Sequence, residues 1–130
     1  MKIARELYEQ IVAHARAEAP NECCGMVAST DGRAVKVFPA ENIHASPLRY
    51  EIAPRQQLEI MTEIDDQDWD LGAIYHSHTR TAPEPSQTDI NAALYPDSLY
   101  VIVGLADGEP DVRAWRIADG KVAQVELVVE

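Results

Sequence analysis

Cysteine is scarce in this sequence. Its only two cysteines, Cys23 and Cys24, are neighbours in the chain. Adjacent cysteines rarely meet the geometry of a disulfide bond, so the chain has no disulfide framework. Neighbouring residues of a strand also point to opposite faces, which leaves the pair badly placed to hold one metal ion together. We therefore expect at least one thiol to be a small buried apolar group, with a reactive thiol as the alternative.

Basic residues and long apolar runs are also scarce. The 130 residues include 11 Lys and Arg against 22 Asp and Glu, a net charge of -11. A surface this negative repels phosphate backbones, which argues against a nucleic-acid partner. The longest apolar runs cover only a few residues, far below the roughly 20 that a membrane-spanning helix needs. Arg5, Glu6 and Glu9 interrupt the start of the chain, so we expect a cytoplasmic protein with no secretory signal and no membrane span.

The remaining composition is typical of a globular protein. Hydrophobic residues make up 46% and charged residues 25% of the chain, which fits one domain over residues 1–130. Periodicity and turn residues predict helices over about 3–18, from Pro54 and over 86–94, an irregular loop over 39–50, and strands over 23–28, 34–37, 71–75, 99–105, 111–117 and 122–129. This mixture predicts an α/β or α+β layered domain in which helices flank a curved, mixed sheet.

Two histidines stand at the end of the strand predicted over 71–75. His76 and His78 are separated by one residue, so the two-residue period of a strand places both imidazoles on one face. Such a pair can converge on a metal ion, although it can equally cap a core edge or face solvent. Asp89 lies in the first turn of the helix entered at Ser86, from which its carboxylate can turn back over the strand end. Two histidines, one carboxylate and a water molecule make an open catalytic zinc site.

Ser86 and Glu22 each allow two interpretations. The segment Ser-Gln-Thr-Asp over 86–89 approximates a capping box, in which Ser86 and Asp89 satisfy the first amides of the helix. Glu22 precedes an apolar strand, where burial would raise its pKa toward the range of a general base. It could equally be an exposed residue at the start of the strand. The acidic run over 63–70 is interpreted as a solvated surface turn rather than a cation site.

These residues resemble the motif of the JAMM or MPN+ metallopeptidases. That pattern is a remote Glu, then His-Ser/Thr-His, a spacer, Ser, a shorter spacer and Asp. Here Glu22 is followed by HSHTRTAPEPSQTD, with seven residues between His78 and Ser86. The similarity continues through PNECCGMV, residues 42–55, LYVIVGL and VRAWRI, so it covers most of the chain. Thr79 departs from the Pro that many relatives have after the second His, and the chain looks most like the bacterial Mec-type sulfur-carrier-protein cysteine peptidases.

The resemblance implies a JAMM/MPN-like, cytidine-deaminase-like fold and one Zn²⁺ per chain, held by His76, His78 and Asp89. It also implies that Glu22 is the general base and acid, and that Ser86 donates a hydrogen bond to the scissile carbonyl. The implied partner is a ubiquitin-like sulfur carrier with a C-terminal Gly-Gly, from which cysteine is removed. A generic isopeptidase of ubiquitin-like conjugates and a non-catalytic MPN interaction module are the alternatives. Small relatives often associate, so a homodimer is compatible with the resemblance.

A different enzyme class uses the same ligand types. Two histidines and a carboxylate also form the facial triad of iron-dependent oxygenases, and Glu84 lies near His78 in the sequence. The three predicted helices argue against that class, because oxygenase barrels with a His-x-His pair are nearly all strand. Ser77 alternates to the opposite face from the histidines and is expected to be a structural hydroxyl. His14 and His44 have no predicted partners and are treated as ordinary residues.

Overall fold

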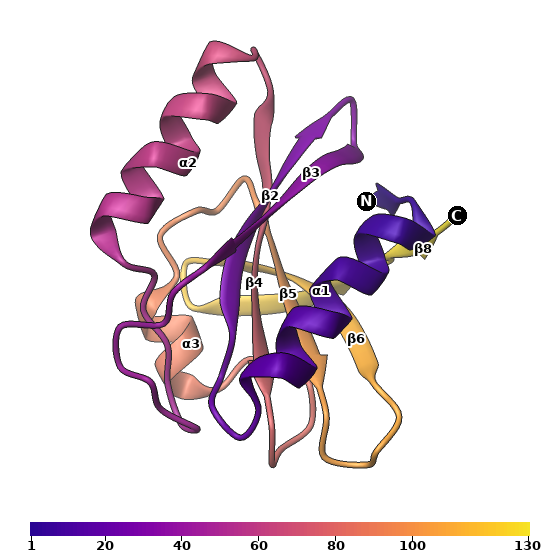
Figure 1. Ribbon diagram of the computed structural model, residues 1–130. Coiled ribbons are helices and arrows are strands. Elements are labelled where there is room, and N and C mark those ends of the chain that lie inside the picture. Colours follow the sequence, from indigo (N-terminus) through magenta and orange to yellow (C-terminus); the bar gives the residue numbers. More distant parts are fainter.

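The computed structural model describes residues 1–130 and is built around one mixed sheet of eight strands (Figure 1). The elements in chain order are β1 (Lys2–Ile3), α1 (Arg5–Glu18), β2 (Cys24–Thr30), β3 (Arg33–Ala40), α2 (Pro54–Asp66), β4 (Asp70–His78), α3 (Gln87–Ala92), β5 (Leu99–Gly104), β6 (Asp111–Ala118), β7 (Lys121–Val125) and β8 (Val128–Val129). The strands lie in the order β7-β6-β5-β4-β2-β3-β1-β8. The pairs β4–β5, β1–β3 and β1–β8 are parallel, whereas the other neighbours are antiparallel.

Helices cover both faces of the sheet, as the alternation along its central strands requires. On one face, Val27 and Tyr75 pack with buried residues of α1. On the other face, Met26 and Ile74 pack with buried residues of α2. Figure 1 shows α1 on one side of the central strands and α2 with α3 on the other. The predicted mixed sheet flanked by helices is therefore confirmed, and no helix has the length and hydropathy of a membrane span.

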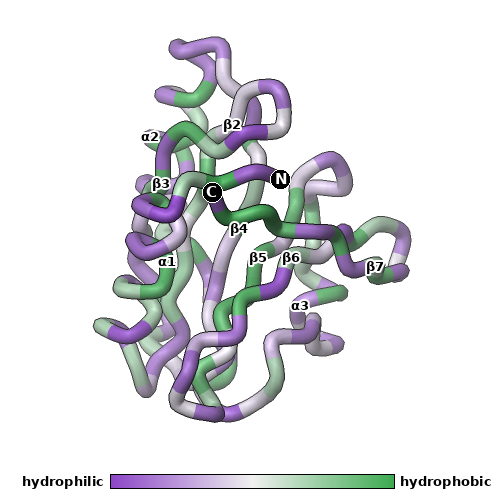
Figure 2. Tube along the Cα trace, turned by 90° about the vertical axis from the view of Figure 1, so that its right-hand side faces the viewer, coloured by the Kyte–Doolittle hydropathy of each residue, from purple (hydrophilic) through white to green (hydrophobic).

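The sheet is strongly curled. β7 and β8 occupy its two opposite edges, yet only two residues, 126 and 127, connect them. Three Cα steps from Val125 to Val128 span at most about 11 Å, so the two edges approach each other at this corner. β8 then runs parallel to β1, with Lys2 opposite Val128. The two ends of the chain consequently lie close together, as Figure 2 shows.

Several predicted boundaries differ from the structure. The single strand predicted over 122–129 is wrong, because the chain leaves β7 at Val125 and joins the other edge as β8. The first helix begins only at Arg5, since β1 occupies the two residues before Ala4. The loop predicted over 39–50 is still strand up to Ala40, and the helix predicted over 86–94 ends at Ala92.

The strands predicted over 23–28 and 34–37 are confirmed as β2 and β3, which pair antiparallel as a hairpin. Its turn consists of Asp31 and Gly32, whose φ angles of 50° and 77° are both positive. Two such residues give the tight turn whose twist matches that of paired strands. This hairpin matters for the site because β2 pairs with β4, the strand that carries the two histidines.

Gly25 marks a very close approach on β2. A Cβ atom at this position would lie 2.3 Å from Cε2 of Tyr75 and 2.5 Å from the carbonyl oxygen of Phe38. Tyr75 has little room to move, because it is fully buried and its hydroxyl lies 2.7 Å from Nδ1 of His14. Gly25→Ala is therefore expected to lower the free energy of unfolding by about 1–3 kcal/mol, the usual cost of overpacking. Urea titration checks this, and a wild-type midpoint would contradict the packing described.

Candidate metal centre and active site

Strand β4 brings two imidazole rings together at its C-terminal end. His76 and His78 are buried, with 1% and 5% of their surface exposed, and their Nε2 atoms lie 3.2 Å apart. Both share a sheet face with Ile74, the face covered by α2, because residues two apart on a strand point the same way. β4 lies between β2 and β5, so the backbone of His76 is fixed by pairing with Cys24 and Ile102. The strand period therefore determines this arrangement.

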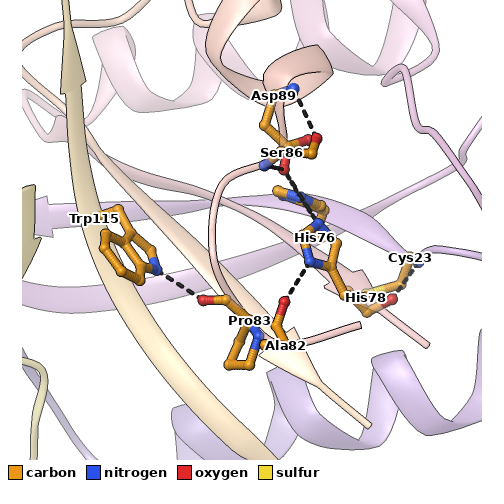
Figure 3. A network of polar contacts seen from close by, with 9 residues as sticks. Cys23, His76, His78, Ala82, Pro83, Ser86, Asp89 and Trp115 are labelled. Atoms are coloured by element: carbon orange, nitrogen blue, oxygen red, sulfur yellow. Dashed lines mark hydrogen bonds and ion pairs between the residues drawn. The ribbon is translucent and has the colours of Figure 1, made fainter. Parts of the chain in front are cut away.

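Helix α3 adds a carboxylate to the pair. Oδ2 of Asp89 lies 3.2 Å from Nε2 of His76 and 3.1 Å from Nε2 of His78. The same oxygen accepts a hydrogen bond from the N–H of Ser86 at 2.9 Å, and Oγ of Ser86 accepts one from the N–H of Asp89 at 3.1 Å. This is a complete capping box, and it holds the Asp89 side chain beside the histidines (Figure 3). The capping interpretation and the ligand interpretation are thus compatible.

The three side chains fit one metal ion with nitrogen and oxygen ligands. Atoms that each lie about 2.0–2.1 Å from a tetrahedral ion are about 3.3 Å from one another, and here the spacings are 3.1–3.2 Å. Nδ1 of His78 lies 2.9 Å from the carbonyl oxygen of Ala82. Because a carbonyl only accepts, Nδ1 carries the ring proton, and the Nε2 lone pair of neutral His78 faces His76 and Asp89.

The electrostatics of the cluster favour an ionised aspartate. Burial lowers the pKa of His76, so its ring is neutral at neutral pH. Burial alone would raise the pKa of Asp89, but hydrogen bonds with both imidazoles and with the N–H of Ser86 hold that pKa well below its ordinary value. Burial likewise opposes protonation of His78, yet Asp89 and the Ala82 carbonyl raise its pKa. A metal ion must displace that proton, so acid should weaken metal binding.

Glu22 lies two residues before β2, and the charges of His78 and Asp89 act on its carboxyl group. Only 5% of its surface is exposed. Burial raises the pKa of Glu22 to about 7, with a smaller lowering effect from His78 and a further raising effect from Asp89. Its backbone N–H donates to the carbonyl of Ser46 at 2.8 Å, and its carbonyl accepts from Nδ2 of Asn42 at 3.1 Å. A buried carboxyl group with a pKa near neutrality has the property that a general base needs.

The cysteines and Ser77 have structural positions. Cys23 and Cys24 are free and buried, and burial raises the pKa of each to about 12. Neither is therefore a thiolate at neutral pH, and the buried-thiol interpretation is confirmed. Oγ of Ser77 accepts a hydrogen bond from the N–H of Cys23 at 2.8 Å. The hydroxyl of Ser77 thereby ties β4 to the residue that follows Glu22, as its predicted structural role requires.

Glu84, His14 and His44 do not belong to the cluster of His76, His78 and Asp89. Glu84 is exposed, and its carboxylate lies 3.8 Å from the guanidinium group of Arg113. It is not among the three side chains that could hold a metal ion, which are those of His76, His78 and Asp89. The alternative triad with Glu84 does not form. His14, for which the sequence placed no partner, contacts the hydroxyl of Tyr75 through its Nδ1 at 2.7 Å. His44 also has a partner, a carboxylate 3.1 Å away in its own loop.

Sequence reasoning missed two residues in the loop between β3 and α2. The ring of Tyr50 stacks on His76, with 4.4 Å between centroids and 22° between planes. Asn42 binds the carbonyl oxygen of Glu22. Both belong to a segment that has no hydrophobic period, so neither side chain's distant contact could be predicted. The family resemblance over residues 42–55 was the one available signal.

Comparison with known proteins identifies a family. The family described as prokaryotic homologs of the JAB domain matches residues 4–118. The chain belongs to this JAB family. The CysO-cysteine peptidase of Mycobacterium tuberculosis is 38% identical over 125 residues, which cover 94% of this chain and 86% of that protein. The desampylase of Haloferax volcanii is 33% identical over 122 residues, which cover 88% of this JAB-family chain and 87% of the relative.

The fold is shared with a solved JAB1/MPN domain. The crystal structure of such a protein from Archaeoglobus fulgidus superposes with a TM-score of 0.66, covering 99% of this chain and 98% of the other, at 21% identity. At that identity the likeness concerns the fold alone. The JAMM/MPN-like fold that the resemblance implies is therefore confirmed.

Proposed function

We propose that this JAB-family chain is a zinc peptidase that cleaves the amide bond after the C-terminal Gly-Gly of a ubiquitin-like sulfur carrier and releases cysteine. The observation that carries the proposal is the convergence of Nε2 of His76, Nε2 of His78 and Oδ2 of Asp89 within 3.2 Å of one another. Buried Glu22 is close enough for the charges of His78 and Asp89 to act on it. Two relatives, a CysO-cysteine peptidase and a desampylase, support the class of reaction. We place the reaction in the cytoplasm and assign it to residues 1–130 as one domain.

The ligand set fits zinc. Two imidazole nitrogens and one carboxylate oxygen are ligands of catalytic zinc sites. When bound, zinc is a Lewis acid and lowers the pKa of a bound water molecule to about 7. The carbonyl of Ala82 orients His78 and the capping box orients Asp89. Because these outer contacts exist already, the ligand side chains need little rearrangement to bind the ion.

Glu22 carries the proton through the reaction. Its carboxylate accepts a proton from the attacking water as the water oxygen bonds to the carbonyl carbon. As the C–N bond breaks, Glu22 gives the proton to the leaving amine, so the products are a free carboxyl terminus and an amine. A pKa of about 7, caused chiefly by burial, suits both transfers at neutral pH. One residue can therefore serve as base and then as acid.

Ser86 has a donor left for the substrate. Its Oγ accepts the N–H of Asp89 at 3.1 Å, and a hydroxyl that accepts a hydrogen bond still has its own proton to donate. We assign this proton to the carbonyl oxygen of the scissile bond, where negative charge grows during attack. Such a donor typically contributes about 3 kcal/mol to catalysis. The capping and catalytic roles of Ser86 thus use different parts of one hydroxyl.

Two substitutions at Ser86 separate these roles. Ser86→Ala is expected to lower kcat by about 10²-fold or more and to cost about 1 kcal/mol of stability, because the helix loses its cap. Ser86→Gly also lacks the hydroxyl, but glycine at an N-cap costs only about a few tenths of a kcal/mol. Steady-state kinetics should show a similar loss of kcat in both variants. Wild-type kcat in Ser86→Gly would refute the catalytic role.

The substrate is tested with a matched pair of conjugates. The zinc-loaded protein is incubated with a carrier that ends in Gly-Gly-Cys and, separately, with the same carrier joined through Gly-Gly to a lysine side chain. Mass spectrometry is expected to detect free cysteine and the carrier ending in Gly-Gly, and the chelator-treated protein serves as the blank. Absence of cysteine release would refute the proposed reaction.

Cleavage of the lysine conjugate alone would favour the second candidate, a generic isopeptidase. That candidate is supported by the similarity to a desampylase. Cleavage of neither conjugate, by a protein that also binds no divalent ion tightly, would favour the non-catalytic, metal-free interaction module.

A further inference from the structure

The loop between β3 and α2 is organised by one side-chain amide. Nδ2 of Asn42 donates to the carbonyl oxygens of Glu22 at 3.1 Å and Arg49 at 3.0 Å. Its Oδ1 accepts from the backbone N–H of His44 at 3.1 Å and of Glu51 at 3.2 Å. These four bonds use both donors and both lone pairs of the amide. Since the partners are backbone carbonyls on one side and N–H groups on the other, the amide can face only one way.

Hydrogen bonds from this loop hold the backbone of Glu22, the proposed base. Asn42 holds the carbonyl of Glu22, and the carbonyl of Ser46, in the same loop, accepts the N–H of Glu22 at 2.8 Å. Both backbone polar groups of Glu22 are therefore bound by this loop. A displacement of the loop would move the Glu22 backbone and, with it, the buried carboxyl group. The position of Glu22 thus depends on a residue 20 positions away in sequence.

The same loop also contacts His76, a proposed metal ligand, through the ring of Tyr50. Two of the bonds made by Asn42 go to the residues on either side of Tyr50, and the Tyr50 ring stacks on His76 at 4.4 Å. Nδ1 of His76 is buried and has no hydrogen-bond partner, whereas the corresponding atom of His78 meets the carbonyl of Ala82. Metal-binding histidines usually owe their ring orientation to such an outer contact. For His76, the stacked ring supplies the orientation instead.

We propose that Asn42 is a positioning residue that fixes Glu22 directly and His76 through Tyr50. The catalytic part of this inference rests on the proposed function, while the part concerning His76 requires only metal binding. A single amide would then fix the positions of Glu22 and His76 relative to each other. General base catalysis depends on that relative position, because a small misplacement of a catalytic group costs a large factor in rate.

Asn42→Asp is the sharpest test. The substitution preserves shape but replaces two N–H donors with an oxygen that faces the carbonyls of Glu22 and Arg49. We expect kcat for carrier cleavage to fall by about 10- to 100-fold, with zinc affinity reduced by a factor in the same range. KM should change little, because no substrate contact is removed. Zinc affinity is measured by competition with a coloured chelator, and folding by circular dichroism at the assay temperature.

His44→Ala is the matched control within the loop. It deletes the His44 contact with the Glu51 carboxylate but leaves the backbone groups bound by Asn42 in place. Wild-type kcat and zinc affinity are expected. A second arm compares Tyr50→Leu with Tyr50→Phe. The Leu variant should bind zinc more weakly, and the Phe variant, which keeps the stacked ring, should restore the affinity.

The outcomes separate this inference from the proposed function. A folded Asn42→Asp with wild-type kcat and zinc affinity would overturn the inference, as would equal losses in His44→Ala. If Asn42→Asp does not fold, Asn42→Ala, which introduces no carboxylate, takes its place with the same expected losses. If the wild type cleaves no carrier, the proposed function fails, and zinc binding still decides the part concerning His76. Equal zinc affinity in Tyr50→Leu and the wild type would overturn that part.

Discussion

Glu22→Gln is expected to lower kcat for amide hydrolysis by about 10²- to 10⁴-fold, the usual contribution of a general acid or base. A glutamine amide has the shape of the carboxylate but cannot accept and return a proton at neutral pH. Zinc content should stay near one ion per chain, because the ligand cluster comprises His76, His78 and Asp89 without Glu22. Kinetics and elemental analysis of the same preparation provide both numbers.

The control for this variant is Glu18→Gln. Glu18 lies at the end of α1, and its side chain is 52% exposed, so loss of its charge should leave both kcat and zinc content unchanged. Normal turnover in Glu22→Gln would refute its assignment as base. Loss of zinc in Glu22→Gln would show instead that the glutamate helps to hold the ion.

His78→Ala is expected to lose zinc and activity together. The substitution removes one of three converging ligand atoms and leaves His76 and Asp89, which lie 3.2 Å apart, as the only protein ligands. Two ligands are fewer than the three that catalytic zinc sites normally have. Elemental analysis after dialysis against a weak chelator should find far less than one zinc per chain, and carrier cleavage should fall to the level of the chelator-treated wild type.

His44→Ala is also the natural histidine control here. His44 belongs to the loop and pairs with Glu51 rather than with the cluster. Its substitution should leave zinc content unchanged. Stoichiometric zinc in folded His78→Ala would contradict the assignment of His78 as a ligand and would mean that the ion is held elsewhere.

The sequence predicts most of the site because the site depends on local periods. The two-residue period of β4 places His76 and His78 on one face, and the helix start at Ser86 places Asp89 in a first turn. The sequence could not decide whether Asp89 caps its helix or faces the histidines. The structure shows that Oδ2 does both, since it accepts the N–H of Ser86 and also contacts both rings.

Other features depend on contacts between distant segments and could not be predicted. The sequence predicts β7 and β8 as one strand, because no local sequence signal marks the point where the chain passes from one edge of the sheet to the other. Asn42 and Tyr50 lie in a loop whose polar residues have no period, so their contacts with Glu22 and His76 become visible only in three dimensions. The burial of Glu22, one of two open alternatives, was likewise decided by packing around β2.

The most direct test of the account is an anomalous difference map at the zinc absorption edge from crystals of the zinc-loaded protein. One peak per chain is expected, about 2.0–2.1 Å from Nε2 of His76, Nε2 of His78 and Oδ2 of Asp89, with the carboxylate of Glu22 outside bonding distance. A peak at another place, or coordination by Glu22 in place of Asp89, would contradict it.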